Sequence, residues 1–171
     1  MNVATAQHRF YRTIDQSSAL KRFRVLVKET DLQIHSRSDV TVPARELVSQ
    51  YRGYIEGFIR RHPLFLNSLV PVSIDEPAPA IVNGMMSAAV KSGVGPMAAV
   101  AGAMAAHVGK DLLSHTPQII VENGGDVYAK TLSPLLMGIY AGSSPLSLHV
   151  GLRLDPKKMP LGVCTCLLYT S

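Results

Sequence analysis

The stretch that sets the fold is Ile119-Ile120-Val121-Glu122-Asn123-Gly124-Gly125-Asp126-Val127-Tyr128. Two runs of strand-type residues flank an Asn-Gly-Gly corner, and Asn-Gly between such runs is one of the strongest local signals of a β-hairpin. Adjacent glycines also let a backbone approach another group closely, because neither residue has a Cβ atom. A hairpin explains the glycines but not the acids beside them, Glu122 and Asp126, so a ligand-binding corner built on the same hairpin stays open.

Before this stretch the sequence predicts strands and then helices. Residues 8–14, 22–28 and 32–35 are typical of an antiparallel meander. Pro43 suits the first turn of a long helix, and Pro63 is expected to stop it. Its apolar stripe predicts packing into the core and consists of Leu47, Tyr51, Tyr54, Ile55 and Phe58.

Two shorter helices are expected next. The first covers residues 81–91 and ends at Gly93; the second begins at Pro96, covers residues 97–107 and ends at Gly109. The second is apolar on all sides, which predicts burial. Strands are then expected at residues 118–122, 126–130, 135–141 and 146–154. Strands, helices and strands in that order indicate one α+β domain.

Composition narrows the class of protein. The chain has 171 residues, of which 47% are hydrophobic and 17% charged, which is typical of a globular domain. The net charge is +5, but no basic run with interleaved aromatics is present, so no nucleic-acid partner is expected. Cys164 and Cys166 are too close for ordinary zinc spacing, and two cysteines make no disulfide framework. The longest apolar stretch is too short for a membrane span. We therefore expect a cytoplasmic protein without a membrane partner.

A second glycine-rich corner lies between the two shorter helices. Its sequence is Gly93-Val94-Gly95-Pro96-Met97-Ala98, which matches the dinucleotide fingerprint G-x-G-x-x-A. That fingerprint requires a strand before it, and a helix is expected here instead, so a dinucleotide-dependent oxidoreductase is a weak alternative. An anion site at the helix N-terminus and a tight helix-to-helix turn both remain open.

Several segments in this order resemble a known family. They are Lys28-Glu29-Thr30-Asp31-Leu32, His62-Pro63-Leu64-Phe65, the two glycine-rich corners, and Gly162-Val163-Cys164-Thr165. From Tyr11 to Thr165 the chain resembles uncharacterised bacterial and archaeal proteins related to ApbE, the FAD:protein FMN transferases. The resemblance implies an ApbE-like fold of antiparallel strands around a central group of helices. Those transferases bind FAD and, with magnesium, move FMN onto a threonine of a target protein.

The resemblance also implies a set of cofactor-binding residues and a small-molecule partner. The Gly-Gly-Asp segment of the transferases lies at their flavin site and matches Gly124, Gly125 and Asp126. The full set of candidates is Gly93, Gly95, Pro96, Met97, Glu122, Asn123, Gly124, Gly125, Asp126, Cys164 and Thr165. The expected ligand is FAD or a related flavin or nucleotide, and Gly125→Val is expected to abolish its binding with little effect on the fold. No catalytic residue is assigned, and a non-catalytic ligand-binding or assembly protein, including a homo-oligomer, stays open.

The C-terminus departs from the family pattern. After Gly-Val-Cys-Thr the family continues with Ser-Ser-Gly and a stretch whose Asp and Thr are similar to the magnesium ligands of the transferases. Here Thr165 is followed by Cys166-Leu167-Leu168-Tyr169-Thr170-Ser171. We therefore expect a truncated ApbE-like domain at residues 1–165, a non-native tail at 166–171, and no metal ligands in this chain.

Overall fold

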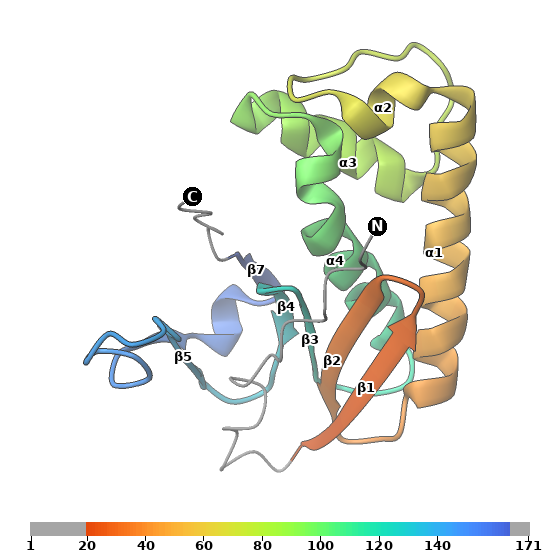
Figure 1. Cartoon of the computed structure of the whole chain (residues 1–171). Coiled ribbons are helices and arrows are strands. Elements are labelled where there is room, and N and C mark those ends of the chain that lie inside the picture. The colour runs from red at the N-terminus through yellow and green to blue at the C-terminus, as the bar shows by residue number, and fades with distance from the viewer. Residues whose placement is uncertain (1–19, 165–171) are drawn as a thin grey trace.

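Five antiparallel strands form the main sheet, and helices cover one of its faces (Figure 1). The computed structural model describes residues 20–164. The elements in chain order are β1 (Lys21–Val27), β2 (Thr30–Ser36), α1 (Thr41–Arg61), α2 (Pro63–Asn67), α3 (Ala80–Ser92), the 3₁₀ helix η2 (Pro96–Ala99), α4 (Val100–Leu112), β3 (Ile119–Asn123), β4 (Asp126–Lys130), β5 (Leu135–Gly138), β6 (Gly151–Leu154), the 3₁₀ helix η3 (Pro156–Lys158) and β7 (Leu161–Val163). The α+β class expected from the sequence is confirmed.

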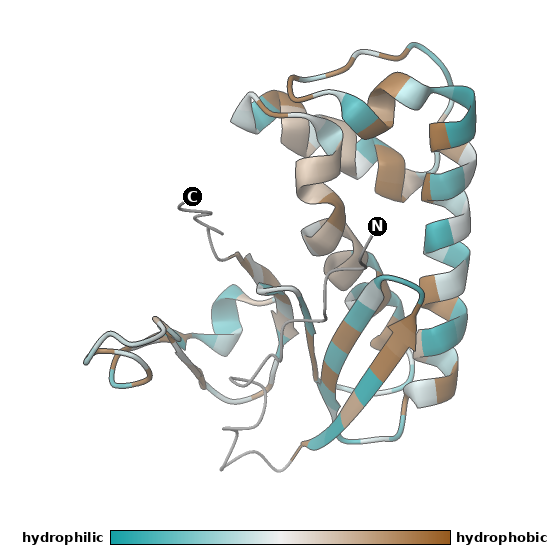
Figure 2. Ribbon diagram, viewed as in Figure 1, coloured by the Kyte–Doolittle hydropathy of each residue, from teal (hydrophilic) through white to brown (hydrophobic). Residues whose placement is uncertain are grey.

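The main sheet has the strand order β1-β2-β3-β4-β7. Its register aligns one row of residues across all five strands, namely Phe23, Ile34, Val121, Tyr128 and Gly162. Residues directly opposite each other in antiparallel strands point to the same face of the sheet. The first four side chains of this row are buried or packed against the core, so the row marks the face that the helices cover. Figure 2 shows polar and apolar residues alternating over the first part of β1, whereas the last three residues, Val25–Val27, are all apolar.

The helical layer follows from the apolar stripes. Helix α1 lies along β1, and α4 lies across β3 and β4. The stripe predicted for α1 is confirmed at Ile55 and Phe58, which are buried, whereas Tyr54 is exposed. Pro63 does more than stop α1: it begins the short helix α2, which brings the ring of Phe65 to 5.1 Å from that of Phe58.

The predicted end of α4 at Gly109 is wrong. Gly109 is buried inside the helix, which continues to Leu112. A Cβ atom at Gly109 would lie 2.3 Å from Cδ1 of Tyr128 on β4. The glycine therefore serves close packing between a helix and an aromatic ring, and not helix termination. Two residues after Gly109, Asp111 accepts a hydrogen bond of 2.6 Å from the hydroxyl of Tyr51, which links α1 to α4.

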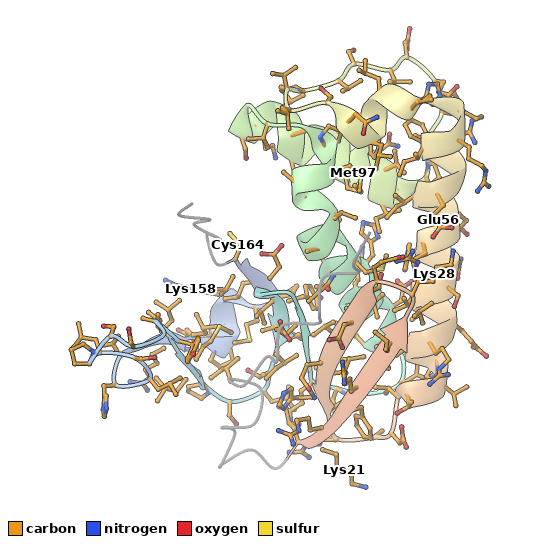
Figure 3. All side chains as sticks on the ribbon, in the orientation of Figure 1. Lys21, Lys28, Glu56, Met97, Lys158 and Cys164 are labelled. Atoms are coloured by element: carbon orange, nitrogen blue, oxygen red, sulfur yellow. The ribbon has the colours of Figure 1, made fainter. Side chains whose placement is uncertain are left out.

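Arg24 on β1 and Lys28 in the turn that follows are exposed and form ion pairs. Arg24 forms an ion pair with Asp31 at 2.9 Å. Lys28 reaches Glu56 of α1 at 3.2 Å, and Figure 3 labels both residues. Exposed pairs of this kind contribute little to stability, because solvent screens the attraction and ordering the long side chains costs entropy.

The last third of the described chain departs most from the sequence-based expectations. The strands expected at 135–141 and 146–154 are reduced to β5 and β6, which form a separate two-stranded sheet. The intervening residues form turns with exposed apolar side chains. The short strand β7 was not predicted, and the strand expected at residues 8–14 lies outside the described residues.

Candidate functional site

A pocket of about 480 Å³ opens between α4, β4 and β7. Its walls come from three segments that are far apart in the sequence: the first half of α4, the start of β4, and β7 with the residues on either side of it. The lining residues are Gly102, Ala106, Asp126, Val127, Tyr128, Pro160, Leu161, Gly162, Val163 and Cys164. Its volume is within the range of about 300–1,000 Å³ that small-molecule sites occupy.

The hairpin corner at the start of β4 is held by its own polar side chains. Gly124 and Gly125 have φ angles of +63° and +100°, as the central residues of a type I′ turn require, so the predicted hairpin is confirmed. The backbone N–H of Gly125 donates to Oε1 of Glu122 at 2.8 Å. Asn123 donates from Nδ2 to the carbonyl of Ala101 at 3.1 Å. Glu122 thus closes the turn, and Asn123 ties the turn to the first residues of α4.

Asp126 connects this corner to the pocket. A Cβ atom at Gly102 would lie 3.3 Å from Oδ2 of Asp126, so the carboxyl group lies directly over the bare face of α4. Burial raises the pKa of Asp126, a hydrogen bond from the Gly102 backbone partly opposes that shift, and the charge of Glu122 adds to it. The result is a partly desolvated carboxyl group at the pocket wall that can accept a hydrogen bond from a ligand.

The other glycine-rich corner is a tight turn between helices. Gly93 is the left-handed C-cap of α3, with a φ angle of +70°. Gly95 is buried, and a Cβ atom there would lie 1.8 Å from the carbonyl oxygen of Ser68. Its missing side chain makes room for the protein's own backbone, which is sufficient reason for the glycine. Pro96 is buried and begins η2, and Figure 3 shows Met97 in a different part of the molecule from Cys164. None of residues 93–97 lines the pocket.

The structure thus brings two of the predicted residues to the pocket, Asp126 and Cys164. Cys164 is an exposed free cysteine, and Thr165 lies outside the described residues. Sequence reasoning missed the helical wall formed by Gly102 and Ala106. Their spacing of four residues, which places both on one helix face, was the available signal.

The described part of the chain contains no cluster of side chains suited to bind magnesium. Between residues 20 and 164, no group of three or more His, Cys, Asp or Glu side chains could hold a metal ion.

None of the described helices is long and apolar enough to cross a membrane.

The fold and the pocket define an α+β protein in which a hairpin and a small-residue helix enclose a site of small-molecule size. The chain belongs to the family described as AbpE bacteria, whose model matches residues 12–168.

Relatives of known sequence support this family. The chain is 36% identical over 146 residues to a UPF0280 protein of Methanococcus aeolicus and 37% identical over 145 residues to the UPF0280 protein MJ1526 of Methanocaldococcus jannaschii. Both matches cover 83% of this chain but 59% of the relative. The UPF0280 protein MK0206 of Methanopyrus kandleri is 37% identical over 144 residues. The chain therefore spans about three fifths of the length of these relatives, whose names assign them no activity.

Proposed function

We propose that the pocket between α4, β4 and β7 binds a flavin or a related nucleotide, as expected of an ApbE-like protein. The observation that supports this proposal most directly is the position of Asp126. This residue ends the Glu-Asn-Gly-Gly-Asp motif and borders the pocket. The resemblance pointed to the same residue from the sequence alone.

The wall chemistry suits a flat, mostly apolar group with a polar edge. Ala106, Tyr128 and Pro160 line the pocket with apolar surface, and Asp126 supplies a hydrogen-bond acceptor. Small-molecule sites commonly combine mostly apolar walls with a few polar groups that fix orientation. An oxidised flavin ring has apolar faces and a polar edge that carries one N–H group.

In this proposal the described residues bind and position the ligand, and no group of metal-ligating side chains is present among them. Glu122 and Asn123 hold the hairpin against α4, which fixes the position of Asp126 relative to the pocket. Since no acidic cluster for magnesium is present in this part of the chain, no step is assigned to a metal. The catalytic form of the proposal is FMN transfer from FAD to a threonine of a partner protein, in which the threonine oxygen forms a phosphoester with FMN, the diphosphate bond of FAD breaks and AMP leaves. Its non-catalytic form needs only the ligand.

Flavin binding tests the proposal directly. FAD is titrated with the 171-residue chain while flavin fluorescence is followed, with and without magnesium. The folded chain should bind, and Asp126→Asn should weaken binding by about tenfold, the worth of one hydrogen bond to a charged group. Asp75→Asn is the matched control, because Asp75 is exposed and lies outside the pocket lining. Absence of binding by a folded chain, or equal effects of the two variants, would contradict the proposal.

The choice of variant follows from the backbone. Gly125→Val, the substitution suggested by the sequence, places a β-branched residue at a φ angle of +100° and would strain the hairpin. A loss of binding in that variant could come from the damaged turn. Asp126→Asn keeps the shape of the side chain and changes only its charge and hydrogen bonding.

A further inference from the structure

The row of residues that faces the helices across the main sheet ends in a glycine, so its last position has no side chain. Ile34, Val121 and Tyr128 fill their positions with side chains packed under the helices. The next position, on β7, is Gly162, which pairs directly with Tyr128. A Cβ atom at Gly162 would find its nearest neighbour, the carbonyl oxygen of Val127, at 3.8 Å. The place of a side chain is therefore open there, and Gly162 borders the pocket.

The wall of the pocket formed by α4 also lacks large side chains. Gly102 and Ala106 are one helical turn apart on α4, and both line the same pocket. One turn further along, Gly109 shows what this helix face accommodates. The Tyr128 ring lies directly against Gly109, with Cδ1, Cε1 and Cγ all within 3.2 Å of where a Cβ atom would be. The protein thus already packs one aromatic ring between the sheet and a side-chain-free turn of α4.

We propose that a flat heteroaromatic ring of the ligand enters the slot between α4 and β7 and takes the place of the side chain missing at Gly162. One face of the ring lies against Gly102 and Ala106, its end approaches the ring of Tyr128, and a ring N–H donates to Asp126. This inference rests on the proposed function and goes further, because it assigns the ring and not the phosphate to the pocket. It also makes Gly162 the residue that decides whether a ring can enter.

The charges of the lining favour a ring over a phosphate. Among the described residues that line the pocket there is no Lys, Arg or His, and the carboxyl group is Asp126. A phosphate placed here would face a carboxylate without a compensating cation, which is costly in a partly buried site. A neutral ring with an N–H edge gains a hydrogen bond and apolar contact instead.

The test separates the ring from the phosphates. Riboflavin, which has the ring but no phosphate, and FAD are titrated in parallel by fluorescence. The folded chain should bind riboflavin, and Gly162→Phe should weaken binding of both ligands at least about tenfold, because the introduced ring fills the slot. The thermal midpoint of Gly162→Phe should not fall, since an aromatic residue suits a strand and the site has room for it. Leu136→Phe on β5 is the control, because that position is 75% exposed and lies outside the pocket.

A second variant guards against loss of the fold. Ala106→Leu fills the slot from the helical side and should produce the same loss of riboflavin binding. Binding of FAD but not of riboflavin, or riboflavin binding unchanged in both filled variants, would overturn the ring assignment and leave the proposed function standing. Failure of the folded wild-type chain to bind either flavin would overturn the proposed function, and the ring assignment with it.

Discussion

The two glycine-rich corners of this protein look alike in sequence and differ in use. Residues 93–97 turn the chain from α3 into η2, and Gly95 fits against the backbone of Ser68. Gly124 and Gly125 turn β3 into β4, with positive φ angles and Asp126 at the pocket wall. The first corner is filled by the protein itself, whereas the second borders a cavity.

The comparison separates two reasons for a glycine. One is close approach, where any side chain would collide with a neighbour; the other is backbone conformation, where a side chain has room but the φ angle disfavours it. Gly95 belongs to the first kind and Gly93 to the second, while Gly124 and Gly125 share the positive φ angle of the second kind. Substitutions by alanine and asparagine distinguish the two kinds, because asparagine tolerates a left-handed φ angle but fills more space.

The largest effect is expected for Gly95→Ala. Its methyl group would meet the carbonyl oxygen of Ser68 at 1.8 Å and the carbonyl carbon at 2.7 Å, so the backbone itself would have to move. We expect a loss of about 3 kcal/mol or more in the free energy of unfolding, at the upper end of the cost of overpacking. Urea denaturation followed by circular dichroism measures this loss.

Gly53→Ala is the matched control for this variant. Gly53 is exposed inside α1, and a Cβ atom there meets nothing within 4 Å. Alanine should therefore raise the free energy of unfolding by up to about 1 kcal/mol through helix propensity. If Gly95→Ala were as stable as wild type, the close approach to Ser68 would not be the reason for the glycine, and the anion-site reading of this corner would regain support.

A smaller loss is expected at the hairpin. Gly124→Ala places a Cβ atom at a φ angle of +63°, which costs about 1–2 kcal/mol for an ordinary residue. Gly124→Asn should cost clearly less, since asparagine is among the residues that adopt this conformation. Urea midpoints of the two variants give the difference. Equal losses would indicate that space, and not φ, limits this position, and would make the two corners alike.

Local signals in the sequence predicted most of the main sheet and its helices. Pro43, Gly93 and the Asn-Gly corner each act within a few residues, and α1, α3 and the β3–β4 hairpin follow them closely. The sequence-based predictions were wrong where a contact between residues far apart in the sequence determines the local structure. Gly109 was expected to end α4, but its role depends on Tyr128, which is 19 positions further along the chain. Strand β7 has only three residues and is defined by its pairing with β4.

The same limit applies to the candidate site. Asp126 was predicted because its motif is local, and it lines the pocket. The glycines at 93 and 95 were predicted on equal grounds, but sequence does not show whether a bare backbone faces a ligand or another part of the chain. Gly102 and Gly162 could not be paired in advance, because the slot between them exists only once α4 lies across the sheet.

Gly93 offers a test of φ alone, with a still smaller effect. A Cβ atom there meets nothing within 4 Å, and the φ angle is +70°. Gly93→Ala should lower the free energy of unfolding by about 1 kcal/mol, and Gly93→Asn by a few tenths, because this C-cap requires only a left-handed residue. Comparing the stability losses of Gly93→Ala and Gly95→Ala, two residues apart, separates the effect of backbone conformation from that of close approach within one corner. A loss at Gly93 as large as that at Gly95 would contradict the distinction.

The smallest effect concerns the pH dependence of stability at the second corner. Burial raises the folded-state pKa of Asp126, so the folded chain holds this proton more tightly than the unfolded chain does. Protonated Asp126 makes its full contribution to the free energy of unfolding below the pKa of the unfolded state, near 4. That contribution is lost as the pH rises through the higher pKa of the folded state. Asp126→Asn removes this loss, so the variant should gain stability relative to wild type between pH 4 and pH 7 in urea denaturation. Asp75→Asn measures the effect of removing one exposed charge. A gain no larger than that of Asp75→Asn would mean that the carboxyl group is well solvated, and the second corner would then lack the desolvated acceptor that distinguishes it from the first.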